Sequence, residues 1–417
     1  MKQEFKKICV VGLGYIGLPT AATFAARGVD VVGFEISEDV VNTINQGRAH
    51  IVEPELDMLV SGAVNSGKLK ATTVPEPADA FIISVPTPIK EDKTPDDSYI
   101  HSAIRAIAPV LEKGNLIVLE STAPVGSTSK IVDTIAEIRQ DLNIPKDHST
   151  PGDLYFVHCP ERVLPGKIIT ELVQNDRIIG GFTPQCAQKA ADLYSIFVRG
   201  ELLLTDDRTA EMAKLVENAY RDVNIAFANE LSFICDEQNI NVWSLIKLAN
   251  RHPRVNILQP GPGVGGHCIA VDPWFIVSAS PETAKLITTA RNVNDRKPGF
   301  VVDKITASAD KFKSPVIACL GLAFKADIDD LRESPAVTIV QKLSTMDCGK
   351  ILAVEPFITQ LPSSMANKNI ELATLDMALQ QADIVVLLVD HKQFKAIDAE
   401  VLQQKILIDT RGVWANT

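Results

Sequence analysis

The first 35 residues place an apolar strand, a glycine-rich turn, a helix and a second strand in direct succession. Residues 7–11 form the first apolar run, Gly12-Leu-Gly14-Tyr-Ile-Gly17 follows at once, and residues 18–27 have a helical pattern. Such glycines permit a tight turn and the close approach of a pyrophosphate, which the N-terminal N–H groups of the helix bind. The second strand, residues 29–34, ends at Glu35, whose carboxylate accepts ribose hydroxyls and repels a 2′-phosphate. The pattern predicts NAD rather than NADP, bound by Gly12, Gly14, Tyr15, Ile16, Gly17 and Glu35.

Strand and helix patterns alternate along the rest of the chain. Buried strands are expected at residues 80–85, 116–120, 154–158 and 177–180, which predicts a parallel sheet wrapped by helices. Apolar residues from Met212 to Ile234 recur at spacings of three and four, which indicates one long helix over residues 209–239. A further helical stretch to about residue 294 and a hinge at residues 297–299 precede a second α/β unit, with strands beginning at residue 316 and at 351–354, 384–389 and 406–409.

These elements predict an α/β protein with two Rossmann-like parallel-sheet domains joined by a long central helix. The expected domains are a cofactor-binding domain over residues 1–205, a central helical domain for dimerisation and the active site over residues 206–300, and a second Rossmann-like domain over residues 301–417.

Composition excludes several classes of protein. The formal net charge of −11 argues against general binding to nucleic acid or to an anionic membrane. The sequence contains no run of about 18 apolar residues, the length needed to cross a bilayer. The first strand begins too early to leave room for a secretory signal. The seven cysteines have neither CxxC nor metal-ligand spacing, so we expect a cytoplasmic protein without a metal site.

A second glycine-rich segment, GPGVGGHCIAVD at residues 261–272, places Cys268 four residues before Asp272. Glycines allow the main chain to approach a ligand closely, and a thiolate is a strong nucleophile near neutral pH. This segment alone leaves two readings open: Cys268 is a nucleophile, or it is a buried and inert cysteine in a turn.

Several motifs in order resemble the nucleotide-sugar 6-dehydrogenases related to UDP-glucose dehydrogenase, over essentially the whole chain. They are GLGYIGLP (12–19), VPTP (85–88), ESTAPVGST (120–128), CPERVLPG (159–166), KLVENAYRDVNIAFANE (214–230), GPGVGGHCIAVDPWF (261–275) and GLAFKADIDDLRESP (321–335). The HC dipeptide and RHPRVNILQP at residues 251–260 are similar to the N-acetylhexosamine branch. The resemblance implies oxidation of a C6 alcohol to a carboxylate with two NAD⁺. UDP-N-acetyl-D-mannosamine is the expected substrate, UDP-N-acetyl-D-glucosamine is the alternative, and polysaccharide biosynthesis is the implied pathway.

The resemblance also implies catalytic roles. Cys268 holds the intermediate aldehyde as a thiohemiacetal and then as a thioester. Lys214 and Asn218, which share a helix face, stabilise oxyanions, and Asp272 orients the hydrolytic water and holds Lys214. Glu161, acting with a water that Thr122 positions, is the expected general base.

The remaining expected contacts also follow from the resemblance. Pro86, Thr87, Thr122 and Lys325 complete the cofactor set. The substrate set is Glu161, Arg162, Val163, Leu164, Lys214, Asn218, Gly265, His267, Lys325 and Arg332, with Arg251 or Arg254 reaching a substrate bound by a neighbouring subunit. That contact and the apolar helix face imply at least a homodimer.

Alternatives stay open for several of these residues. Arg332 can instead form a salt bridge with Asp329 or Glu333, and Lys214 can be a solvated charge. His267 is expected in substrate recognition or packing rather than as a base, and His158 and His252 are undecided between packing and sugar contact.

Two residues depart from the family pattern. Glu35 stands where aspartate is commoner, and Pro165 stands where UDP-glucose-type relatives carry a second glutamate, so it receives no role.

Two other functions compete with this one. If the protein were a sugar epimerase or dehydratase, we would expect a YxxxK pair on a helix after the cofactor domain, and the sequence lacks such a pair. In a non-catalytic NAD-binding regulator, Cys268 would be structural.

Overall fold

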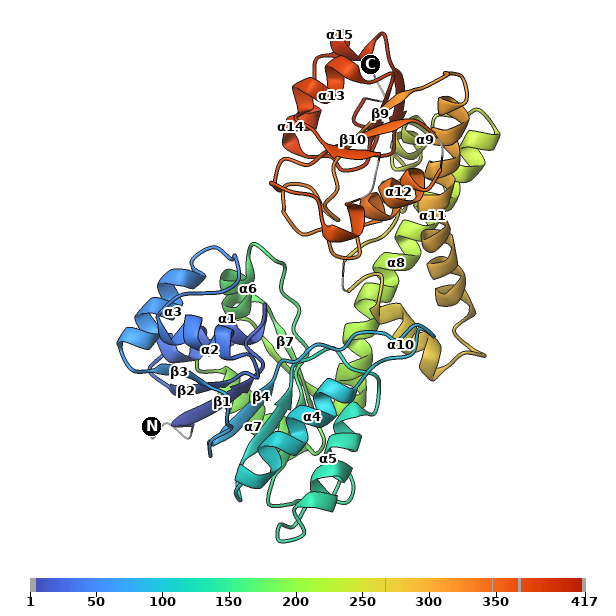
Figure 1. Ribbon diagram of the computed structural model, residues 1–417. Helices are drawn as coiled ribbons and strands as arrows, with labels where there is room; N and C mark the ends of the chain where they lie inside the picture. The colour runs from blue at the N-terminus through green and yellow to red at the C-terminus, as the bar shows by residue number, and fades with distance from the viewer. Residues whose placement is uncertain (1–4, 267, 347, 367–368, 415–417) are drawn as a thin grey trace. The chain divides into compact units, whose positions relative to one another are not determined.

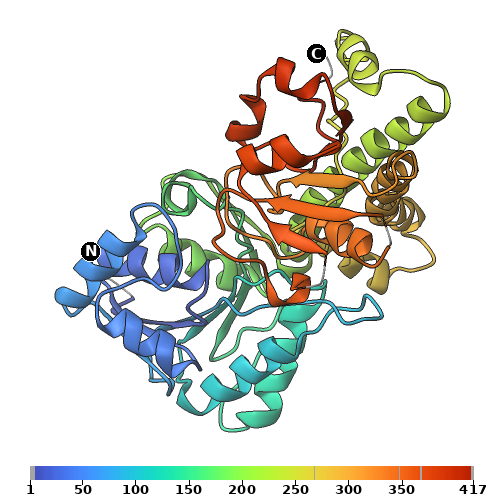
Figure 2. The same ribbon diagram turned by 45° about the horizontal axis from the view of Figure 1, so that its top comes forward.

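The computed structural model describes residues 5–266, 268–346, 348–366 and 369–414 (Figures 1 and 2). The chain divides into two compact units, the first formed by residues 1–217 with 274–279 and the second by residues 218–273 with 280–417. Both units are α/β, so the predicted fold class of two Rossmann-like sheets and a long helix is confirmed.

The first unit contains an eight-stranded sheet in the order β3-β2-β1-β4-β5-β6-β7-β8. The strands are β1 (Lys7–Val11), β2 (Asp30–Phe34), β3 (Leu69–Thr72), β4 (Ala80–Ile83), β5 (Leu116–Leu119), β6 (Tyr155–His158), β7 (Arg177–Gly181) and β8 (Leu202–Asp206). One pairing corrects the all-parallel prediction, because β7 runs antiparallel to β6. The connection from β6 to β7 holds only the short helix α6 (Ile168–Gln174), and β7 then pairs in parallel with β8.

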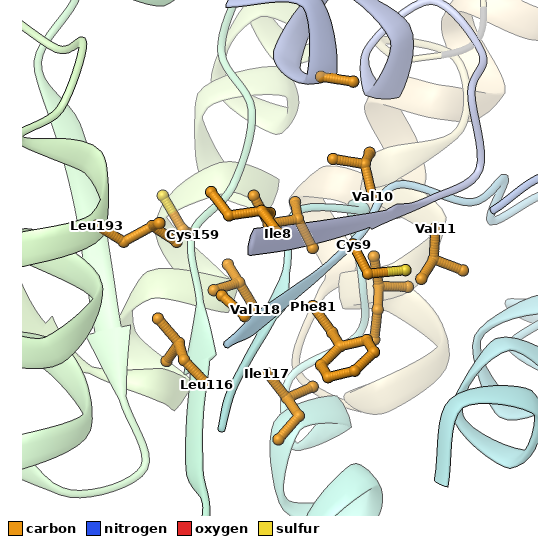
Figure 3. Packing of buried hydrophobic residues seen from close by; sticks show 14 of the residues in the cluster. Ile8, Cys9, Val10, Val11, Phe81, Leu116, Ile117, Val118, Cys159 and Leu193 are labelled. Carbon is orange, nitrogen blue, oxygen red and sulfur yellow. The ribbon is translucent and has the colours of Figure 1, made fainter. Parts of the chain in front are cut away.

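Helices cover this sheet, and its central strands are therefore buried on both faces. The helices are α1 (Gly17–Ala26), α2 (Glu38–Asn45), α3 (Leu56–Asn65), α4 (Ser98–Ile107) followed by the 3₁₀ turn η1 (Ala108–Val110), α5 (Ser127–Ile138) and α7 (Pro184–Tyr194). Residues 274–279 of α10 (Asp272–Ala279) also belong to this unit. Figure 3 shows apolar side chains of β1, β4 and β5 packed together, among them Ile8, Phe81 and Val118. These near-continuous apolar runs explain why the sequence pattern located the central strands.

Helix α8 (Asp207–Glu237) is the predicted long helix, and its 31 residues begin in the first unit and end in the second. Its buried residues include Leu215, Ala219 and Ala226. Five large apolar residues at spacings of four and seven stay exposed, namely Met212, Val216, Tyr220, Phe227 and Ile234. The apolar pattern is therefore only partly satisfied within one chain.

The second unit contains a parallel five-stranded sheet in the order β11-β10-β9-β12-β13. Its strands are β9 (Val316–Leu320), β10 (Lys350–Val354), β11 (Ile370–Leu372), β12 (Ile384–Leu387) and β13 (Ile406–Asp409). Its other helices are α9 (Val242–Ala249), α11 (Lys285–Ala309), α12 (Pro335–Ser344), η2 (Ser363–Met365), α13 (Leu375–Gln381), α14 (Lys392–Lys395) and α15 (Ala399–Leu402). The strand order is that of one dinucleotide-binding half with two further parallel strands.

The predicted hinge at residues 297–299 is wrong, because α11 continues through Pro298. A proline inside a helix loses one backbone hydrogen bond and costs about 3 kcal/mol. Packing offsets this cost: Lys297, Pro298 and Val301 are buried, and about two turns before Pro298 the buried Arg291 forms an ion pair with Asp222 of α8.

Among the residues that the structure describes, none of the helices combines the length and the apolar character that a membrane span requires.

Candidate active site

The first glycine-rich turn leaves an open space beside Gly14. Gly12 has φ +85°, and a Cβ there would lie 2.6 Å from the carbonyl oxygen of Ser84. A Cβ at Gly17 would lie 1.8 Å from the carbonyl oxygen of Gly12, whereas one at Gly14 would meet no heavy atom within 4 Å. Gly12 and Gly17 are therefore required by the turn itself, and Gly14 keeps free the space that a pyrophosphate needs.

Glu35 lies beside this turn, as the sequence predicts. Its Oε2 accepts a hydrogen bond from the Leu13 backbone N–H at 3.0 Å, and its Oε1 accepts one from the Ser37 N–H at 3.1 Å. Tyr15 is 42% exposed at the turn. The longer glutamate side chain thus reaches the turn, where an NAD ribose is bound in this fold.

The other predicted residues of the first unit follow neighbouring parallel strands. Pro86 and Thr87 come after β4, Thr122 comes after β5, and Glu161 comes after β6. The carboxyl ends of parallel strands meet at one edge of a sheet, so these residues share the edge of the glycine-rich turn.

Of the three residues after Glu161 that we expected to bind substrate, Arg162 has a partner within the protein. Its Nη2 lies 2.8 Å from Glu217 Oε1 of α8. Val163 is half-buried and Leu164 is exposed.

Glu161 forms a buried ion pair that the sequence analysis missed. Its Oε2 accepts a hydrogen bond from Arg177 Nη2 at 2.8 Å. Arg177 Nη1 also lies 3.4 Å from Glu120 Oε1, and Glu120 is fully buried. The only signal in the sequence is a charged residue at the start of an apolar strand.

Lys214 of α8 lies near the fully buried His158, the last residue of β6. Burial, with a smaller contribution from the Lys214 charge, lowers the pKa of His158 to about 3. His158 is therefore uncharged at neutral pH, and its complete burial is typical of a packing residue.

Asn218 and Asp272 are brought together in the second unit. Asn218 Nδ2 donates a hydrogen bond to Asp272 Oδ2 at 2.6 Å, and both side chains are buried. The backbone N–H of Asp272 donates to the carbonyl oxygen of Cys268 at 2.8 Å, so a single turn separates the two residues.

Cys268 is exposed, whereas the other six cysteines are buried. Cys268 is therefore not a buried cysteine. His267 lies outside the described residues.

The glycines before Cys268 allow the chain to pack against itself. A Cβ at Gly265 would lie 2.6 Å from the carbonyl oxygen of Glu333 and 2.7 Å from Pro335 Cδ. Gly266 has φ +82°, and a Cβ there would lie 3.2 Å from the Phe324 ring. The cysteine segment is thus seated on residues 324–335, which carry the predicted substrate residues Lys325 and Arg332.

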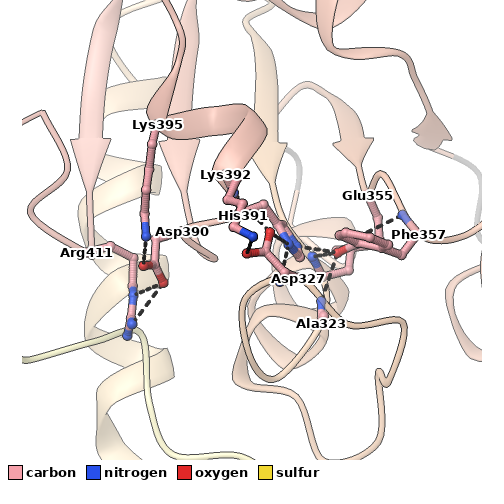
Figure 4. Close-up of polar contacts among 10 residues, drawn as sticks. Ala323, Asp327, Glu355, Phe357, Asp390, His391, Lys392, Lys395 and Arg411 are labelled. Atoms are coloured by element: carbon pink, nitrogen blue, oxygen red, sulfur yellow. Dashed lines mark hydrogen bonds and ion pairs between the residues drawn. The ribbon is translucent and has the colours of Figure 1, made fainter. Parts of the chain in front are cut away.

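In the second unit, as in the first, a glutamate accepts a hydrogen bond from the backbone of the turn after the first strand, and here a histidine binds the glutamate as well (Figure 4). Leu322 and Ala323 donate backbone hydrogen bonds to Glu355 Oε2 at 2.7 and 3.0 Å. His391 Nε2 lies 3.1 Å from the same oxygen, and His391 Nδ1 accepts from the Asp327 N–H at 2.9 Å. Burial would raise the pKa of Glu355, but the hydrogen bonds from His391 and the backbone hold it below its ordinary value.

This arrangement anchors the backbone on both sides of the exposed Lys325. Ala323 occupies the place that corresponds to Gly14 of the first turn, and its N–H is committed to Glu355. The second turn therefore presents a lysine side chain rather than an open glycine.

Arg332 forms a salt bridge, but with a different residue from those considered. Its Nε and Nη2 donate to Asp330 at 2.9 and 2.6 Å. The two-residue spacing allows the guanidinium to bind both carboxylate oxygens. Arg251 and Arg254 are exposed after α9, and His252 is exposed there and accepts from the Arg254 N–H.

Comparison with protein-family models assigns almost the whole chain. The NAD binding domain of the UDP-glucose/GDP-mannose dehydrogenase family matches residues 6–198, its central domain matches residues 208–296, and its UDP binding domain matches residues 318–416.

Individual relatives agree with this assignment. The chain is 61% identical to the NDP-N-acetyl-D-galactosaminuronic acid dehydrogenase of Ralstonia nicotianae, over 99% of this chain and 97% of the relative. It is 58% identical to the UDP-N-acetyl-D-mannosamine dehydrogenase of Yersinia pestis, over 99% and 100% of the two chains. The solved UDP-N-acetyl-mannosamine dehydrogenase of Staphylococcus aureus superposes with a TM-score of 0.87 at 44% identity, over 98% of this chain and 95% of that one.

The open glycine turn with its glutamate, the exposed cysteine and these matches lead to one conclusion. The chain belongs to the UDP-glucose/GDP-mannose dehydrogenase family and is an NAD-dependent UDP-sugar dehydrogenase.

Proposed function

We propose that the protein oxidises C6 of UDP-N-acetyl-D-mannosamine in two steps to the uronate, with Cys268 as the nucleophile. The observation that carries the mechanism is the exposure of this cysteine among six buried ones. The relatives named UDP-N-acetyl-D-mannosamine dehydrogenase, at 56–60% identity, support the sugar.

Each residue of the proposed site has a stated task. Bound NAD⁺ accepts the hydride in each oxidation. Glu161, through a water at Thr122, removes the proton of the 6-hydroxyl in the first step. The Cys268 thiolate then adds to the aldehyde, and water hydrolyses the thioester that the second oxidation leaves.

Lys214, Asn218 and Asp272 serve the charged intermediates. Asn218 Nδ2 has two hydrogens, and Asp272 accepts one of them at 2.6 Å. We assign the second hydrogen, together with the Lys214 ammonium, to the developing oxyanion, a type of contact worth about 3 kcal/mol per donor. Asp272 also orients the hydrolytic water.

The UDP group and the cofactor complete the assignment. Lys325, held between two anchored backbone positions, and the guanidinium of Arg332 are the proposed phosphate ligands, with Arg251 or Arg254 supplied by a second subunit. Pro86, Thr87 and Tyr15 line the cofactor side.

We keep the three-domain division at residues 205 and 300. We also place the reaction in the cytoplasm, because an odd number of seven scattered cysteines fits a reducing compartment.

Two other sugars compete. The Ralstonia relative, named for N-acetyl-D-galactosaminuronic acid, favours UDP-N-acetyl-D-galactosamine. UDP-N-acetyl-D-glucosamine differs from the proposed substrate only at C2. The mechanism is the same for all three.

One experiment tests sugar and mechanism together. The protein is incubated with NAD⁺ and each of the three UDP-N-acetylhexosamines or UDP-glucose, and NADH is counted per sugar consumed. We expect about two NADH per sugar with UDP-N-acetyl-D-mannosamine, because both oxidations take place before release. A ratio near one would contradict the two-step mechanism, and preference for another sugar would contradict the substrate.

Replacement of Cys268 by serine tests the nucleophile in the same assay. We expect uronate formation to fall by a factor on the order of 10³ or more. Iodoacetamide should modify one cysteine of the folded native protein and none of the variant. Full turnover in the variant would leave Cys268 with no part in catalysis.

A further inference from the structure

A buried polar network connects the proposed general base to the wall of the glycine-rich turn. Arg177, the first residue of β7, donates through Nη2 to Glu161 at 2.8 Å and through Nη1 to Glu120 at 3.4 Å. Glu120 also accepts hydrogen bonds from the Tyr194 hydroxyl at 2.6 Å and from Ser84 Oγ at 3.0 Å. Ser84 in turn supplies the carbonyl oxygen that forbids a Cβ at Gly12.

Both oxygens of Glu161 are held. Arg177 binds Oε2, and the backbone N–H of Arg162 donates to Oε1 at 2.6 Å. An ionised carboxylate offers about four acceptor positions, so acceptor capacity remains for a water. The two bonds fix the orientation of the carboxylate and therefore the positions from which a water can donate a hydrogen bond to it.

Arg177 is held as firmly as the carboxylate that it binds. Its side chain is 5% exposed, and its guanidinium carbon lies 4.6 Å from the centre of the Tyr194 ring and 5.7 Å from that of Phe197. A planar guanidinium can stack on rings and bridge two carboxylates at once, whereas a lysine ammonium is a point charge.

Few charges face Glu161 within this network. Burial raises the pKa of Cys159 to about 11 and raises that of Tyr194 well above its ordinary value, so both are neutral at pH 7. Burial also raises the pKa of Glu120, against the charge of Arg177. On the side of α8, Arg162 is paired with Glu217. Arg177 is therefore the cation that compensates Glu120 and Glu161 together.

We propose that Arg177 is the positioning residue for Glu161: it holds that carboxylate in one orientation, with the buried Glu120 as its second anchor. The inference rests on the proposed role of Glu161 as base. Stability alone is a weak reason for such a network, because apolar residues often replace buried ion pairs without loss.

The test compares two changes whose effects on the pH profile have opposite signs. Arg177→Lys replaces the bridging fork with a point charge, so the Glu161 carboxylate is held less firmly. We expect the acid limb of kcat/KM to move up by about one pH unit and kcat to fall by roughly 10- to 100-fold, with KM for NAD⁺ little changed. Glu120→Gln removes a competing negative charge, so the acid limb should move to lower pH.

Two further variants separate the possible failures. In a Glu161→Gln background, Arg177→Lys should cause no additional loss, because its effect passes through Glu161. Arg139→Lys is the matched control: Arg139 binds Asp141 and the carbonyl oxygens of Ala108 and Leu111, and its replacement should leave the pH profile unchanged.

An unmoved acid limb in Arg177→Lys, a shift of the same sign in Glu120→Gln, or equal losses in both backgrounds would overturn the inference. Should Arg177→Lys not fold, the sign of the Glu120→Gln shift decides. Full activity of Glu161→Gln would remove the base assignment and this inference with it. The two-step oxidation, which Cys268 tests separately, would remain.

Discussion

At the scale of single residues, the burial of Lys297 lowers the free energy of unfolding by an amount that depends on pH. Its ammonium lies 4.7 and 4.8 Å from the ring centres of Phe233 and Phe300, and burial, with a smaller contribution from Lys304, lowers its pKa to about 7. An unfolded lysine keeps its proton up to about pH 10.4, so the unfolded chain binds more protons between pH 7 and 10. The free energy of unfolding should therefore rise with pH across this window.

The variant Lys297→Met should remove that dependence. We expect urea denaturation of the native protein to show a contribution of at most about 1.4 kcal/mol per pH unit between pH 7 and 10, and the variant to show a flatter profile. Lys311→Met, at an exposed position just after α11, is the control and should keep the native slope. Equal slopes in all three proteins would show that Lys297 loses no proton in this range.

At the scale of elements, the glycine-rich turn contains two kinds of glycine. Its backbone requires Gly12 and Gly17, whereas Gly14 leaves space for the cofactor. Gly17→Ala should strongly destabilise the protein, because its Cβ would lie 1.8 Å from a carbonyl oxygen. Gly14→Ala should leave the melting temperature unchanged, since its Cβ meets no protein atom within 4 Å. The same methyl group enters the pyrophosphate space, so KM for NAD⁺ should rise about tenfold or more. An unchanged KM in Gly14→Ala would place the cofactor elsewhere.

At the scale of the whole molecule, we expect a homodimer that forms through the exposed apolar face of α8. Phe227 is 52% exposed and Ile234 is 49% exposed. Large exposed apolar faces mark interaction sites, and two copies of one helix face can form a two-fold interface. The double change Phe227→Asp with Ile234→Asp should give monomers in sedimentation velocity, whereas Met58→Asp, at an exposed residue of α3, should not.

Mixed dimers test whether the subunits share a site. Chains with Cys268→Ser are coexpressed with chains in which Arg251 and Arg254 are alanine, and we expect each variant to be inactive alone. If an arginine serves the neighbouring substrate, one site of each mixed dimer has an intact cysteine and an intact arginine, and activity returns. Persistent inactivity of purified mixed dimers would mean that cysteine and arginine act within one chain.

Local features of the fold were predictable because neighbours in the sequence determine them. The turn at Gly12, the carboxylate of Glu35 and the long helix α8 depend on backbone conformation and apolar spacing over short distances. The predicted hinge failed because the fate of Pro298 depends on packing, including the burial of Val301. A salt bridge of Arg332 was only the alternative to phosphate binding, and the choice of Asp330 as its partner depends on side-chain direction.

The sequence by itself determined the family, the cofactor-binding turn and the candidate nucleophile, since each is a short pattern whose chemistry is local. Only the tertiary structure decided that Arg177 binds both Glu120 and Glu161, because an antiparallel β7 brings its first residue to the carboxyl end of β6. It also decided that the glycines before Cys268 serve contact with Phe324 and Pro335. Such contacts join residues distant in the chain, and their energy exists only once the strands have paired and the side chains have left water.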